Sequence, residues 1–122
     1  MIDDDLAGFV RATLRSVWAL ELLLLMKRRA DETWTTERLV QELRASTPLV
    51  SEILQDLTTA GIISRTAEGA YQYGPASEVV HNCCDALEKA HRERPLSVVK
   101  LIASAQNDRL QTFADAFRFK DK

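Results

Sequence analysis

Residues 34–77 read WTTERLVQELRASTPLVSEILQDLTTAGIISRTAEGAYQYGPAS, and this stretch decides the fold of the 122-residue chain. Its first part has apolar residues at the three- and four-residue steps of a helix: Leu39, Val40 and Leu43. This spacing predicts an amphipathic helix over 37–45. A hydroxyl of Thr35 or Thr36 would cap the free amides of its first turn, and Trp34 before it would form a minimal strand.

The connection after this helix, residues 45–47, is too short for anything but an angled partner helix. Proline at the first helical position lacks only an amide that would be unpaired there anyway, so we expect Pro48 to begin the second helix and Thr47 to cap it. Gly61 can adopt the left-handed conformation in which helices commonly end. The pattern therefore predicts the second helix over 48–60.

A β-hairpin is expected directly after the second helix. Residues 62–66 are β-branched and alternate in polarity, residues 70–73 return, and Glu68-Gly69 between them is a turn signal. A helix, a tight turn, a second helix and a hairpin, in this order, make up a winged helix-turn-helix. The predicted fold class is mainly α with a small β-hairpin wing, and with flanking N- and C-terminal helices.

The segment resembles the winged-helix transcriptional regulators of the MarR and Rrf2 families. The residues that carry the resemblance are LVSEILQDLTTAGIISR (49–65), with its order of helix, glycine and strand, and EGAYQYGPAS (68–77), which is similar to the compact wing of Rrf2-type proteins. It covers about a third of the chain, and no sensor motif of either family is matched residue by residue. The resemblance implies a transcriptional regulator that binds double-stranded DNA as a homodimer.

The second helix can be divided into two faces, because each residue of a helix turns the chain by about 100°. One face is apolar and is predicted to be buried: Val50, Ile53, Leu54 and Leu57. The resemblance implies that the opposite stripe enters the DNA groove: Ser51, Glu52, Gln55 and Thr59. In the major groove Gln55 could pair with adenine, and Glu52 could accept a hydrogen bond from cytosine.

Charge opposes this hypothesis. The formal net charge is −2 and the pI is about 5.7, and residues 34–76 hold three cations against five anions. Phosphate neutralisation supplies nearly all non-specific DNA affinity, so this affinity would have to come from Arg38, Arg44 and Arg65, helped by residues 27–29 and doubled by dimerisation. The alternative is a winged-helix protein–protein interaction module that does not bind DNA, whose second helix presents an acidic surface to a protein partner.

The N-terminal segment, residues 1–33, is predicted to be a helix or a helix pair over 3–29. Aspartates begin this stretch and cations end it, as the helix dipole favours, and Ser16 marks a break. Nearly every residue from Leu20 to Met26 is apolar, so this half must be covered on several sides. We expect it to form part of the core and of a dimer interface.

The C-terminal segment, residues 78–122, is predicted to hold three helices that pack in the same compact domain and contribute to dimerisation. The first, 78–94, is capped by Ser77, and the second starts at Pro95. The third, 108–119, carries an apolar stripe rich in phenylalanine. A ligand pocket between these helices is a further alternative.

Four potential metal ligands lie along one side of the predicted helix 78–94: His81, Cys84, Glu88 and His91. The outer two are about 15 Å apart at 1.5 Å per residue, so one ion could meet only adjacent members. Cluster-binding Rrf2 proteins use three separated cysteines, whereas this chain has one adjacent pair. We therefore expect no metal and no cofactor, and interpret the cysteines as small buried apolar residues.

Other classes of protein are not supported by the sequence. It contains no nucleophile elbow, no phosphate-binding glycine loop and no convergent acid–base pair, so we expect no enzymatic activity. The most apolar stretch, Val17 to Met26, is about half the roughly 20 residues that a bilayer span needs. The N-terminus lacks the cationic start of a secretory signal, and the adjacent cysteines are unsuited to a disulfide. A cytoplasmic location is expected.

Overall fold

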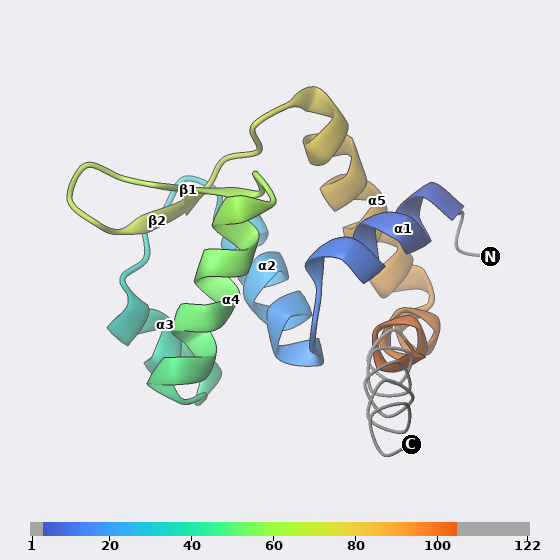
Figure 1. Cartoon of the computed structure of the whole chain (residues 1–122), viewed down its shortest axis with the longest axis horizontal. Helices are drawn as coiled ribbons and strands as arrows, with labels where there is room; N and C mark the ends of the chain where they lie inside the picture. The colour runs from blue at the N-terminus through green and yellow to red at the C-terminus, as the bar shows by residue number, and fades with distance from the viewer. Residues whose placement is uncertain (1–3, 105–122) are drawn as a thin grey trace, which may run out of the picture.

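The computed structural model describes residues 4–104, which form helices and one short hairpin (Figure 1). The elements in chain order are α1 (Asp4–Thr13), α2 (Val17–Arg28), α3 (Thr36–Leu43), α4 (Thr47–Thr59), β1 (Ile63–Arg65), β2 (Tyr71–Tyr73) and α5 (Glu78–Glu93). A further helical segment runs over 95–104. The predicted helix over 108–119 lies outside the described residues.

The N-terminal segment is a helix pair, and Ser16 makes the break. Its side chain accepts a hydrogen bond from the Ala19 amide, at 3.2 Å, and so caps α2. The same chemistry starts α3, where Thr35 accepts from the amide of Arg38, and α5, where Ser77 accepts from that of Val80. Both of these caps agree with the sequence pattern.

The turn between α3 and α4 differs from the prediction in one respect. Ser46, not Thr47, caps α4, accepting a hydrogen bond from the amide of Leu49 at 3.3 Å. The turn closes one residue earlier than predicted because Arg44 adopts the left-handed conformation (φ 54°) directly after α3. Thr47 is thus the first residue of α4, and Pro48 follows it still inside the first turn, where its missing amide has no cost.

The hairpin that follows α4 is the wing. Gly61, with φ of 77°, ends α4 and lets the chain reverse into β1. β1 and β2 pair antiparallel with Ile63 opposite Tyr73. Trp34 extends this sheet by an isolated bridge, in which its amide donates to the Tyr71 carbonyl at 2.7 Å. The described chain therefore has the fold of a winged helix-turn-helix, as predicted.

The core is built around α2, which runs through the middle of the molecule (Figure 1). Its buried side chains explain the nearly continuous apolar run of the sequence: Ala19, Leu20, Leu22, Leu23, Leu24 and Met26. α3 and β2 pack against α2, while α1 packs against α5 on the other side of the molecule. One cluster of buried apolar residues extends from Leu6 to Ile102. No helix in the described part of the chain is long and apolar enough to cross a membrane.

Candidate nucleic-acid interface

The outer face of α4 is open to solvent in the described part of the chain. Helical geometry placed its residues correctly: Val50, Ile53, Leu54 and Leu57 are buried. The four residues predicted to enter the groove are all exposed: Ser51, Glu52, Gln55 and Thr59. The second helix of the helix-turn-helix therefore presents a polar stripe that a large partner can reach.

A hollow of about 360 Å³ lies between this stripe and the wing. Its lining comes from α4 and from both strands: Ser51, Gln55, Thr58, Thr59, Arg65 and Tyr71. Three of the four predicted groove residues and one of the three predicted phosphate residues thus share one concave surface. Hydroxyls, one amide and one guanidinium line it, and each of these groups can bond to base edges or to phosphate.

Arg65 is the cation of this concave surface. It lies on the exposed side of β1, with its guanidinium carbon 5.8 Å from the centre of the Tyr71 ring. The guanidinium lies beside Gly69 in the wing turn: Nη2 is 3.7 Å from the position that a Cβ atom would take on this glycine. No carboxylate of residues 4–104 pairs with it, so its charge is available to an anionic partner.

The other two predicted phosphate residues differ from each other. Arg44 is exposed in the tight turn between α3 and α4, and no carboxylate of the described chain holds it. Arg38 is committed within the protein, since Nη2 donates to Glu32 Oε1 at 2.7 Å. Its guanidinium carbon also lies 3.9 Å from the centre of the Trp34 ring. Arg38 thus covers the ring of Trp34, just before α3.

In the positive run at residues 27–29, Lys27 is paired within the protein. Lys27 is nearly buried and lies between two carboxylates of α5, with Nζ 2.8 Å from both Asp85 Oδ1 and Glu88 Oε1. Burial lowers the pKa of Lys27, but these two hydrogen bonds outweigh burial, so the net pKa is raised above its usual value. The hydrogen bond from Lys27 lowers the pKa of Asp85. Lys27 is therefore a structural cation, and the expectation that it helps to bind phosphate is not met by its placement.

Two of the four potential metal ligands of α5 contact other side chains. His81 Nδ1 is 3.2 Å from the hydroxyl of Tyr73, and Glu88 is held by Lys27. Burial raises the pKa of the Cys84 thiol to about 11, so that it stays protonated near neutral pH. Within residues 4–104, no three histidine, cysteine, aspartate or glutamate side chains gather as a metal site would require.

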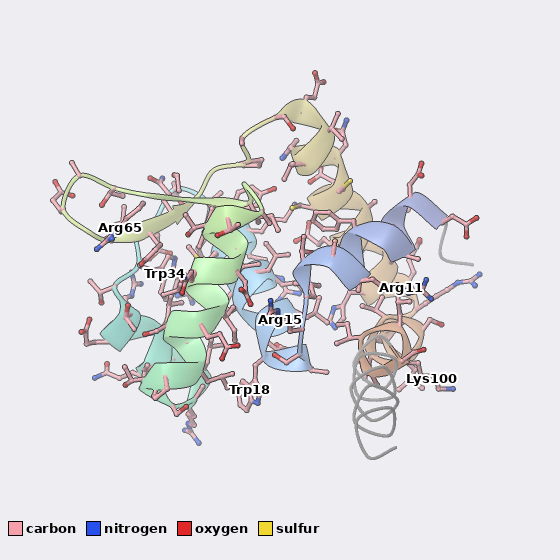
Figure 2. The ribbon with its side chains drawn as sticks, viewed as in Figure 1. Arg11, Arg15, Trp18, Trp34, Arg65 and Lys100 are labelled. Atoms are coloured by element: carbon pink, nitrogen blue, oxygen red, sulfur yellow. The ribbon has the colours of Figure 1, made fainter. Side chains whose placement is uncertain are left out.

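A cation that the sequence did not single out lies against the outer face of α4. Arg15, in the break between α1 and α2, places Nη1 3.8 Å from Glu52 Oε1 and Nε 3.5 Å from Asp56 Oδ2. Figure 2 shows it between the end of α1 and α4. No periodicity predicts the direction of a side chain in a non-helical break, so this contact has no signal in the sequence pattern.

Comparisons with known proteins add little to this geometry. No known protein family and no curated protein matches the chain. Among solved structures, a mutant of ZitR from Lactococcus lactis is similar to it, with 20% sequence identity and a TM-score of 0.42, over 88% of this chain and 75% of that chain. A likeness at this level carries no argument about function.

Proposed function

We propose that this protein is a DNA-binding transcriptional regulator of the winged-helix type that acts as a homodimer. The observation that carries the proposal is the concave surface between α4 and the wing, where Ser51, Gln55 and Thr59 lie with Arg65. An exposed helix at this position of a helix-turn-helix enters the major groove in the proteins that use this fold to bind DNA. The wing beside it brings a cation to the adjacent phosphates.

Each residue has a distinct role in the proposal. Ser51, Glu52, Gln55 and Thr59 contact base edges, and Gln55 is the best suited to a bidentate contact with adenine. Arg65 and Arg44 bind phosphate because their charges are unpaired in the described chain. Arg38 is a weaker phosphate ligand, since approach to DNA competes with its bond to Glu32. Phosphate contacts position the protein, whereas base contacts select the sequence.

Dimerisation would bring two such surfaces onto one duplex and double the number of phosphate contacts. Two large apolar side chains support it, because they lie outside the core: Val79 on α5 is 72% exposed, and Leu96 in the following helix is 73% exposed. Val79 lies at the start of α5 and Leu96 beyond its end, so the two are separate exposed apolar residues and not one patch. We infer that a second copy covers apolar residues of this part of the chain.

The test is a fluorescence-anisotropy titration of mixed-sequence duplex DNA at about 50 mM salt, where electrostatic binding is strong. We expect micromolar binding that weakens steeply with salt, and two chains per duplex site at saturation. Arg65→Glu should weaken binding at least about tenfold, since it turns a phosphate attraction into a repulsion.

The matched control is Lys100→Glu, which makes the same change of charge at the opposite end of the molecule (Figure 2). Because Lys100 lies one helical turn after Leu96, analytical ultracentrifugation checks that this variant keeps the oligomeric state of the wild type. It should change the affinity by less than about twofold, because salt screens charges that are more than a Debye length from the DNA. Equal losses in the two variants would remove the wing from the interface. No binding by the wild-type chain at micromolar concentration would leave the protein–protein interaction module as the better hypothesis.

A further inference from the structure

The outer face of α4 combines an accessible surface with an unfavourable charge. Glu52 and Asp56 lie one helical turn apart on it, and two carboxylates near the phosphate backbone oppose binding. Side-chain exposure is 62% for Glu52 and 27% for Asp56, so neither charge is removed by burial. Any DNA-binding function of this helix requires a local counter-charge.

Arg15 supplies this counter-charge from outside the helix-turn-helix. Its guanidinium faces both carboxylates at once, through Nη1 toward Glu52 and Nε toward Asp56. The three charges therefore sum to −1 where the two acids alone would give −2. The separations of 3.5 and 3.8 Å are well below the Debye length of about 10 Å at 0.1 M salt. At this salt concentration the attraction between Arg15 and the two acids is therefore only partly screened.

The backbone on each side of Arg15 is fixed. Leu14 before it is fully buried, and its amide donates to the carbonyl of Val10 at 2.9 Å. Ser16 after it caps α2. Arg15 is thus the one residue between a core anchor and a helix cap. The backbone from which its side chain extends toward α4 is therefore held on both sides.

The approach of Arg15 to α4 leaves the rest of the helix accessible. A hollow of about 250 Å³ separates the end of α1 from α4, and Gln55, Asp56 and Thr59 line its α4 side. Arg15 itself remains 62% exposed. The contact is therefore a bridge across a solvated gap, and of the predicted groove residues it engages Glu52, while Ser51, Gln55 and Thr59 stay exposed.

We propose that Arg15 is a positioning residue of the DNA face, which holds the carboxylates of Glu52 and Asp56 and cancels part of their charge, so that α4 can approach DNA. The inference rests on the proposed function and assigns a role to a residue outside the helix-turn-helix. It also draws the Glu52 carboxylate toward Arg15, and this contact can open when Glu52 accepts a hydrogen bond from cytosine. The effect of Arg15 on affinity passes through the two acids and not through a phosphate contact of its own.

The experiment compares Arg15→Gln with Arg11→Gln in the same anisotropy titration. Arg11 lies four residues earlier, on α1 and away from α4 (Figure 2), so the two variants lose the same charge but only Arg15→Gln loses the contact with α4. We expect Arg15→Gln to weaken binding about fivefold and Arg11→Gln less than about twofold. Arg15→Lys should restore most of the affinity, because lysine keeps the charge beside the acids.

Both variants are then repeated in the double variant E52Q/D56N, where the acids are absent. The proposal expects Arg15→Gln to become equivalent to Arg11→Gln there, within about twofold. A fivefold loss that persists without the acids would show a direct phosphate contact by Arg15 and overturn the positioning role, as would equal losses in the wild-type background.

Failure of this inference is distinct from failure of the proposed function. If the wild-type chain binds DNA but Arg15→Gln has no specific effect, only the role of Arg15 falls. If the wild-type chain does not bind DNA, both proposals fall. Circular dichroism spectra and melting temperatures of the variants check that each loss reflects the interface and not the fold.

Discussion

Lys27 and Arg15 each face two carboxylates, and the two clusters differ in distance and in exposure. Lys27 lies 2.8 Å from both Asp85 and Glu88, and its side chain is only 11% exposed. Arg15 lies 3.5 and 3.8 Å from its partners on α4, and its side chain is 62% exposed. Asp85 and Glu88 are 51% and 26% exposed, so only the cation of this cluster is nearly buried. Loss of a close pair with a nearly buried cation has a larger effect on stability than loss of a fully solvated pair.

Because of this difference, we expect the Lys27 cluster to stabilise the fold and the Arg15 cluster to affect binding. The Lys27 cluster connects α2 with α5 near the strand β2, where Tyr73 also lies 6.0 Å from the ammonium, measured to the ring centre. It joins α2 to α5 beside the end of β2. The Arg15 cluster lies on the surface proposed to meet DNA, where a weakly held cation can rearrange as phosphates approach. We therefore expect mutations of the first cluster to change stability, and mutations of the second to change binding.

The largest effect is expected for Lys27→Met, which keeps the apolar stem and removes the charge. Asp85 and Glu88 then face each other without a cation, and the free energy of unfolding should fall by about 2 kcal/mol. Urea denaturation followed by circular dichroism measures it. Lys100→Met, at an exposed position, is the control and should change the free energy by less than about 0.5 kcal/mol. A loss of similar size in both variants would contradict the distinction between the clusters.

The pH dependence of this effect follows from the shifted groups. Asp85 has a pKa below its usual 3.8 in the folded protein, so its contribution is present above pH 3.8 and is lost as the pH falls through the folded value. Lys27 has a pKa above its usual 10.5, so its contribution is present below pH 10.5 and is lost as the pH rises through the folded value.

The stability difference between wild type and Lys27→Met should therefore be constant from about pH 5 to 9 and shrink below pH 3.8 and above pH 10.5. Urea midpoints measured across this range give the profile. A difference that instead grew toward acid pH would mean that the aspartate is not stabilised by the lysine.

Both clusters also show where sequence reasoning succeeds and where it stops. The faces of α4, the cap Ser77 and the break at Ser16 were predicted, and Thr35 is one of the two caps expected for α3, because each depends on residues within a few positions of one another. The cap of α4 was misplaced by one residue, because Ser46 and Thr47 both carry hydroxyls and only the backbone conformation of Arg44 distinguishes them. Local chemistry could be predicted to within about one residue.

Contacts between distant residues could not be predicted. The sequence groups Lys27 with the two arginines that follow it, but its partners are about 60 positions away on α5, and only the packing of α5 against the rest of the molecule brings them together. Arg15 points to α4 because of the angle between α1 and α2, which no periodicity encodes. The candidate groove residues can be predicted from the spacing of apolar residues along one helix. The charged side chains that lie near them depend on how the whole chain folds.

The smallest effect is expected for the stability of Arg15→Gln. An exposed ion pair in high dielectric contributes about 0–1 kcal/mol, and the distances here are longer than those of charge-assisted hydrogen bonds. The free energy of unfolding should therefore change by less than about 0.5 kcal/mol, and 0.5 M salt should make this change smaller still, while the loss in Lys27→Met persists. Denaturation at low and high salt measures both variants together. A loss near 2 kcal/mol for Arg15→Gln would make this arginine a structural residue like Lys27, and a weaker DNA affinity of the variant would then reflect a damaged fold.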